Sequence, residues 1–198
     1  VAGTVGAVTN NALGVAGVAF NARIQPVRVM GRCGGLVSDI VDGIVWASGG
    51  AIAGVPANAT PAKVINMSLG GTGPCDAAYQ TAIDAAVARG TVVVVAAGNS
   101  NADASGHRPG SCNNVINVAA LDREGNRAAY SNFGALIDLA APGGETSPTA
   151  ANGVLSTLNF GTTTPYPSTS GYYARLQGTS MAAPHIAGLA ALMRSRNP

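Results

Sequence analysis

The sequence predicts an α/β fold, a three-layer sandwich in which helices cover both faces of a mostly parallel central sheet. Strand-like runs alternate with helical patterns from Ile24 to Thr91. The run Thr91–Ala97 is continuous and largely β-branched, which is typical of a strand covered on both faces. The 198 residues are 47% hydrophobic, so one domain can bury a sizeable core. No internal repeat or linker divides the chain, and residues 1–198 are expected to form a single domain.

Each element follows from a local pattern. Residues 1–7 are small and apolar with no capping signal before them, so we expect a helix entered partway along, followed by a loop over 9–15. Apolar residues at three-four spacing predict helices over Val37–Ser48 and Asp76–Arg89, each followed by glycine. Residues 144–174 are expected to form loops or an irregular hairpin around Val154–Thr157. Strands are predicted over Ile24–Met30, Lys63–Ser68, Thr91–Ala97, Val115–Ala119 and Leu136–Ala140.

The last predicted helix begins at a serine. Residues 178–185 read Gly-Thr-Ser-Met-Ala-Ala-Pro-His, and a helical pattern continues from Ile186 to Arg194. Gly178 lets the backbone turn, Thr179 can cap, and Ser180 then falls in the first turn, where amide groups lack intrahelical partners. A negative charge that grows near Ser180 would be stabilised there. An ordinary capped helix would explain a lone Gly-Thr-Ser equally well.

Two predicted strands end in polar or glycine-containing segments. Ser68-Leu69-Gly70 follows one of them, and Ala97-Gly98-Asn99 follows the next. Parallel strands bring their carboxyl ends to one edge of the sheet, which is where ligands bind in such folds. A dinucleotide-binding Gly-x-Gly-x-x-Gly motif is excluded, because its third glycine would fall at position 76, which is Asp76. An α/β-hydrolase elbow is excluded because Ala182 stands where it needs glycine.

Charge and cysteine content narrow the expected partners and the expected compartment of the protein. The net charge is +2, and the basic residues are dispersed from Arg23 to Arg196, so nucleic acid and membrane surfaces are not expected partners. Low lysine content with many alanines and glycines suits a secreted bacterial protein. Of the three cysteines we predict a Cys33–Cys75 disulfide, since both lie in glycine-flanked loops after strand-like runs. Three free thiols, Cys112 included, in a reducing compartment are the alternative.

Six segments together resemble the subtilisin-like serine proteases in content, order and approximate spacing. They are Val1–Thr4, Asn66–Gly70, Ala96–Asn99, Tyr130–Gly134, Ala140–Gly143 and Gly178–His185. The resemblance implies that Ser180 is the nucleophile and that Asn99 donates to the oxyanion. It also implies that Ser68-Leu69-Gly70 pairs with an extended substrate, and that Ala97-Gly98 lines the main specificity pocket with room for a large apolar side chain. Arg108-Pro109 aligns with an X-Pro bond that is often cis in that family.

The resemblance also implies a calcium loop near the first residues. Its candidate ligands are the carbonyl groups of Thr9, Leu13 and Val15 and the side chain of Asn11, since hard cations prefer oxygen ligands. This loop is one residue longer than the commonest family version, and the carboxylate that would come from upstream is absent. The sequence is compatible with a calcium site that is filled and with one that is partly formed or empty.

The family's catalytic His and Asp precede the Val-Ala-Gly-Thr segment, which here is residues 1–4. His185 lies five residues after Ser180 and points about 140° away on the same helix, and nothing places His107 near Ser180. We therefore expect an incomplete catalytic domain of a secreted serine endopeptidase, truncated at both ends. Its activity would require the associated N-terminal segment with both residues. The alternative is a non-catalytic peptide-binding module that keeps the substrate groove.

Overall fold

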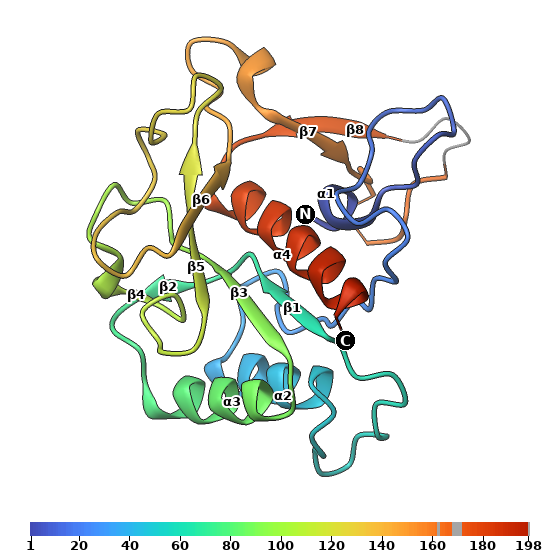
Figure 1. The fold of residues 1–198 in the computed structure, drawn as a ribbon, viewed down its shortest axis with the longest axis vertical. Coiled ribbons are helices and arrows are strands. Elements are labelled where there is room, and N and C mark those ends of the chain that lie inside the picture. The colour runs from blue at the N-terminus through green and yellow to red at the C-terminus, as the bar shows by residue number, and fades with distance from the viewer. Residues whose placement is uncertain (162, 168–171, 198) are drawn as a thin grey trace.

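The computed structural model describes residues 1–161, 163–167 and 172–197. It confirms the α/β sandwich: a parallel four-stranded sheet lies between two layers of helices (Figure 1). The strand order is β1-β3-β5-β6. These strands are β1 (Val64–Met67), β3 (Val92–Ala96), β5 (Ile116–Leu121) and β6 (Leu139–Pro142). The helices are α1 (Ala2–Gly6), α2 (Val37–Ala47), α3 (Ala77–Ala88) and α4 (Thr179–Arg196).

The central strand β3 shows why the sheet needs helices on both faces. Val93 and Val95 pack into one core with α2 and α3, whereas Val94 and Ala96 pack into a second core with α4. Successive side chains of a strand point to opposite faces, so an unbroken valine run supplies both cores. The two antiparallel pairs lie outside this sheet. They are β2 (Gly71–Thr72) with β4 (His107–Arg108), and β7 (Val154–Thr157) with β8 (Tyr173–Leu176).

Two short 3₁₀ helices, η1 (Ala104–Gly106) and η2 (Ala150–Asn152), complete the elements. The hairpin expected around Val154–Thr157 is confirmed by β7 and β8. The strand expected over Leu136–Ala140 begins later, at Leu139, because Asn117 holds the preceding residues through its side chain and backbone. The Asn117 side chain donates to the Leu136 carbonyl over 3.0 Å, and its backbone amide donates to the Asp138 carboxylate over 2.8 Å. No helix in the described part of the chain is long and apolar enough to cross a membrane.

The strand predicted over Ile24–Met30 is wrong, because this segment has no strand assignment. A groove separates it from β1, lined by residues of 25–29, α2 and 62–69. A strand requires a hydrogen-bonded neighbour, and none of the described segments lies in that groove. The outer edge of β1 is therefore unpaired within the sheet, since β1 pairs with β3 alone. Asn66 of β1 lines the groove, and its Oδ1 atom is buried with no partner.

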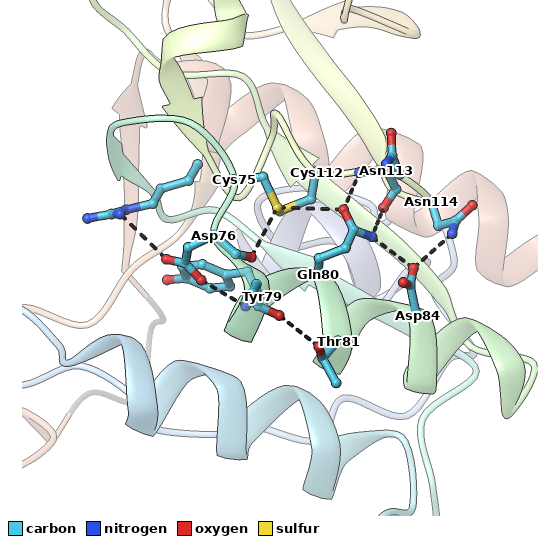
Figure 2. Close-up of a disulfide and its surroundings, with 11 residues drawn as sticks. Cys75, Asp76, Tyr79, Gln80, Thr81, Asp84, Cys112, Asn113 and Asn114 are labelled. Carbon is cyan, nitrogen blue, oxygen red and sulfur yellow. Dashed lines mark hydrogen bonds and ion pairs between the residues drawn. A yellow bond between two sulfur atoms is a disulfide. The ribbon is translucent and has the colours of Figure 1, made fainter.

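The predicted Cys33–Cys75 disulfide is also wrong: Cys75 bonds to Cys112 (Figure 2), and Cys33 is an exposed free thiol. The β2–β4 pair joins the chain before α3 to the chain before Cys112, which brings the two sulfurs together. Cys33 follows the 24–30 segment, which does not enter the sheet. The predicted Cys33–Cys75 pairing required this segment to be a strand of the sheet.

Further bonds tie the disulfide to α3 (Figure 2). The Gln80 side chain accepts from the Asn113 amide over 2.9 Å and donates to Asp84 over 2.8 Å. Asp76, the N-cap of α3, accepts from the Tyr79 amide over 3.0 Å and pairs with Arg108 over 3.5 Å. The Arg108-Pro109 peptide bond is cis, as the resemblance implied.

Removing the disulfide with Cys75→Ala/Cys112→Ala is expected to lower the free energy of unfolding by about 2–4 kcal/mol, because it closes a loop of 37 residues. Thermal unfolding of the full-length protein under non-reducing conditions measures the change. Cys33→Ala is the control and should leave the melting temperature unchanged. An equal loss from both variants would contradict the observed pairing.

Candidate active site

Ser180 lies in the first turn of α4. The helix N-cap is Gly178, whose φ of 145° lies in the region that favours glycine, and no side chain caps the helix. The expected capping role of Thr179 is therefore wrong. Its hydroxyl instead donates to Asn99 Oδ1 over 2.9 Å and accepts from the Gly98 amide over 3.1 Å. The Ser180 backbone amide donates to no acceptor in the described residues and remains available to a ligand.

The Ser180 side chain faces the end of β1. Its hydroxyl donates to the Ser68 carbonyl over 3.3 Å, and the Ser68 hydroxyl donates to the Ser180 carbonyl over 2.9 Å. These reciprocal bonds place the serine at the carboxyl end of the sheet, where the strand-end argument expected a ligand.

Two hydrogen bonds to its side-chain oxygen orient Asn99. Asn99 Oδ1 accepts from the Thr179 amide over 2.8 Å as well as from the Thr179 hydroxyl. Both acceptor positions of the carbonyl oxygen are thus used. The amino group Nδ2 then points away from Thr179 and has no acceptor in the described part of the chain. Asn99 is exposed, so a ligand can reach this amino group.

The Asn99 amino group and the Ser180 amide border one shared position. A Cβ atom built on Gly178 would lie 3.6 Å from the Ser180 nitrogen and 3.7 Å from both Nδ2 and Oδ1 of Asn99. Since residue 178 is glycine, this space holds no side chain. An oxygen atom that lay closer to the two nitrogens than this point could accept from both donors, which is the arrangement that stabilises the oxyanion of acyl transfer.

Asn132, which the sequence analysis gave no role, holds the loop that carries Asn99. It is 1% exposed. Its amide donates to the Gly98 carbonyl over 3.0 Å, and Nδ2 donates to the Ala97 carbonyl over 2.8 Å. Its Oδ1 accepts from the amides of Ser100 over 2.9 Å and Ala102 over 3.2 Å. Four hydrogen bonds therefore fix the loop on both sides of Asn99.

Tyr130 holds the other half of the site. Its phenol oxygen accepts from the Gly178 amide over 2.9 Å and donates to the Gly144 carbonyl. Burial raises the pKa of Tyr130 to about 12, so the phenol keeps its proton and both bonds up to strongly alkaline pH. Only the motif Tyr130–Gly134 in the sequence could have pointed to these supporting roles.

The predicted substrate segments lie next to one another. β1 and β3 pair in parallel, with Met67 opposite Val95, so Ser68–Gly70 and Ala97–Gly98 leave the sheet side by side. Leu69 packs its side chain against the α2–α3 core. Its backbone makes no bond to the described residues, so it can pair with an extended peptide.

Neither histidine serves Ser180 as a base. His185 makes its hydrogen bond to the Met181 carbonyl over 2.9 Å, within its own helix. His107 lies on β4 and makes no hydrogen bond to Ser180. Within residues 1–161, 163–167 and 172–197, the Ser180 hydroxyl has no hydrogen bond to an imidazole or carboxylate group.

The expected calcium ligands lie in a loop with unusual backbone angles. Asn10, Ala12 and Gly14 have φ values of 62°, 58° and 56°. Asn11 Oδ1 accepts from the Leu13 amide over 3.1 Å, and the buried hydroxyl of Thr9 has no partner. The described residues contain no cluster of three or more His, Cys, Asp or Glu that could hold a metal. Neutral oxygen donors fit a hard cation in kind, but no carboxylate joins them.

Comparisons with known proteins show the family to which this chain belongs. The profile of the subtilase family, peptidase family S8, matches residues 1–198. An "Extracellular protease" of Xanthomonas campestris pv. campestris is 58% identical over 198 residues, which are 100% of this chain and 32% of that protein. An "Extracellular basic protease" of Dichelobacter nodosus is 52% identical over 98% of this chain and 30% of that protein.

Solved structures of proteases superpose on the fold of this chain. A protease from Pseudoalteromonas arctica superposes with a TM-score of 0.93 at 59% identity, covering 98% of this chain and 57% of that one. A cold-adapted subtilisin-like serine proteinase has a TM-score of 0.74 at 32% identity, covering 99% of this chain and 60% of that one. The chain thus spans about a third of these curated relatives and under two thirds of these solved chains. The family match over residues 1–198 shows that this chain belongs to the subtilase family of peptidases.

Proposed function

We propose that this chain is the part of a secreted serine endopeptidase that carries the nucleophile Ser180 and the oxyanion donor Asn99. The observation that supports this most is the position shared by the Ser180 amide and Asn99 Nδ2. The names of the relatives, extracellular proteases, support secretion and peptide substrates.

In the proposed reaction, Ser180 Oγ attacks the scissile carbonyl carbon and loses its proton to a base. The negative charge that develops on the carbonyl oxygen is stabilised by the Ser180 amide and Asn99 Nδ2. The C–N bond then breaks as the base returns the proton to the leaving amine, leaving an acyl ester on Ser180. Water, deprotonated by the same base, hydrolyses the ester and restores the hydroxyl.

We further propose that the base, a histidine, and its orienting aspartate come from residues outside 1–198. Three observations support an additional strand in the groove between residues 24–30 and β1: the unpaired edge of β1, the partnerless Oδ1 of Asn66, and the side chains of residues 25–29 that line the far side. Residues 1–198 alone would then be inactive, and activity would return when that segment is associated.

A fluorophosphonate probe tests the function, because it labels only an activated serine. The full-length protein should be labelled at Ser180, and Ser180→Ala should abolish labelling. Ser195→Ala, a change to another serine on α4, should not. Residues 1–198 alone should remain unlabelled. A folded full-length protein that is not labelled would favour the non-catalytic peptide-binding module instead.

The support of Asn99 by Asn132 can be tested with a double-mutant cycle on kcat. Asn99→Ala should lower kcat about 100- to 1,000-fold, a range taken from a subtilisin, a member of the same family. Asn132→Ala should lower kcat about tenfold when Asn99 is present but about twofold or less in the Asn99→Ala background, because it acts through Asn99.

The control is Asn117→Ala, since Asn117 is also 1% exposed but lies on β5 and bonds Leu136. It should lower the melting temperature and leave kcat unchanged. Additive losses from the two site variants would show that Asn132 does not position Asn99.

We propose that the loop formed by Thr9, Asn11, Leu13 and Val15 binds calcium in the mature enzyme. Calcium at about 100 times its dissociation constant would then add about 2.7 kcal/mol to the free energy of unfolding. Calcium, but not magnesium, should raise the melting temperature, and Asn11→Ala should reduce the rise. If the variant responds to calcium as the parent does, the loop is not the site.

A further inference from the structure

His107 lies between the two segments that border Ser180. A Cβ atom built on Gly98 would lie 2.8 Å from His107 Cδ2 and 2.9 Å from Cγ, and one built on Gly70 would lie 2.5 Å from Nε2. The imidazole therefore touches the backbone of both segments. The β2–β4 pair, in which His107 faces Thr72, fixes its position.

This position matters for a bound peptide. With its carbonyl carbon at Ser180 Oγ and its carbonyl oxygen near Asn99 Nδ2, the residue that contributes the scissile carbonyl, here called P1, lies between Ser68–Gly70 and Ala97–Gly98. Under the proposed function, its side chain would extend into the gap between these segments. The small residues Ala97–Gly98 suggested room for a large apolar group, but the His107 ring occupies part of that gap.

The ring also offers polar atoms. His107 is half-buried, and its two nitrogens make no hydrogen bond to the described residues. Burial lowers the pKa of His107 below its usual value, so the ring is neutral at pH 7 and above. A neutral imidazole has one donor and one acceptor nitrogen, and either can bond a short polar side chain.

Resting on the proposed function, we propose that His107 closes the P1 pocket and selects short side chains, such as alanine, serine and asparagine, over large aromatic ones. Loss of the ring would deepen the pocket. Substrate discrimination by a pocket changes by about 10- to 200-fold when the space for one small apolar group is gained or lost.

The first experiment measures kcat/KM of the full-length protein on succinyl-Ala-Ala-Pro-X-p-nitroanilides with X = Ala or Phe. The parent should prefer Ala. His107→Ala should raise the Phe/Ala ratio about tenfold or more. Thr72→Ala, which alters the exposed cross-strand neighbour of His107 and leaves the ring, should keep the parent ratio. A parent that prefers Phe, or a ratio unchanged by His107→Ala, would overturn the proposal.

His107→Asn, which is shorter but still polar, is the second variant if His107→Ala does not fold, and it should also raise the Phe/Ala ratio. Fluorophosphonate labelling separates the two proposals. Labelled protein with an unaltered P1 preference contradicts the role of His107 alone, whereas a folded protein with no labelling and no hydrolysis contradicts the proposed function.

A second readout is the Asp/Asn ratio of kcat/KM at P1 as a function of pH, in which titration of the shared catalytic groups cancels. The charged groups near His107 are Arg108, paired with Asp76 over 3.5 Å, and Asp103, which precedes η1. No charged side chain near His107 comes from Gly70, β2 or Ala97–Asn99. Protonation of His107 should raise the ratio as the pH falls from 8 to 5.5, and His107→Ala should remove this rise. A flat profile in the parent would show that the imidazole does not face P1.

Discussion

The site depends on the hydrogen bonds between Asn99 and Thr179, residues 80 positions apart in the chain. They join the loop after β3 to the first turn of α4. Because both bonds end on Asn99 Oδ1, they leave its amino group as a donor beside the Ser180 amide. Thr179 can make them only because its hydroxyl does not cap the helix. Gly178 takes the N-cap position instead, with a φ of 145° that costs glycine little.

Buried polar groups give this arrangement its rigidity. Asn132 and Tyr130 lie two residues apart, yet one holds the Asn99 loop and the other holds the turn at Gly178. A buried amide such as that of Asn132 that lost its partner would remain desolvated without compensation, at a cost of about 1–3 kcal/mol. The proposed oxyanion position would therefore be formed before substrate arrives, as electrostatic stabilisation of a transition state requires.

The layers of the fold could be predicted because periodicity and burial are local signals, as in the valine run of β3. The roles expected of Ser180 and Asn99 came from the resemblance of six segments to a known family, because a helix start or a strand end alone fits an ordinary cap or turn equally well. The wrong predictions concern features that depend on contacts between segments distant in the sequence. Ile24–Met30 has strand-like residues but no neighbour to pair with, and the partner of Cys75 depends on the two-residue β2–β4 contact. That same contact places His107 between Gly70 and Gly98, and strands this short leave no pattern in the sequence.

The most direct test of the shared oxygen position is a crystal structure of the full-length protein with a peptide boronic acid bound to Ser180 Oγ. One boronate oxygen should lie about 2.7–3.1 Å from both Asn99 Nδ2 and the Ser180 amide nitrogen. A covalent adduct whose oxygens contact neither donor, with Asn99 still bonded to Thr179, would contradict the assignment of this position as the oxyanion site.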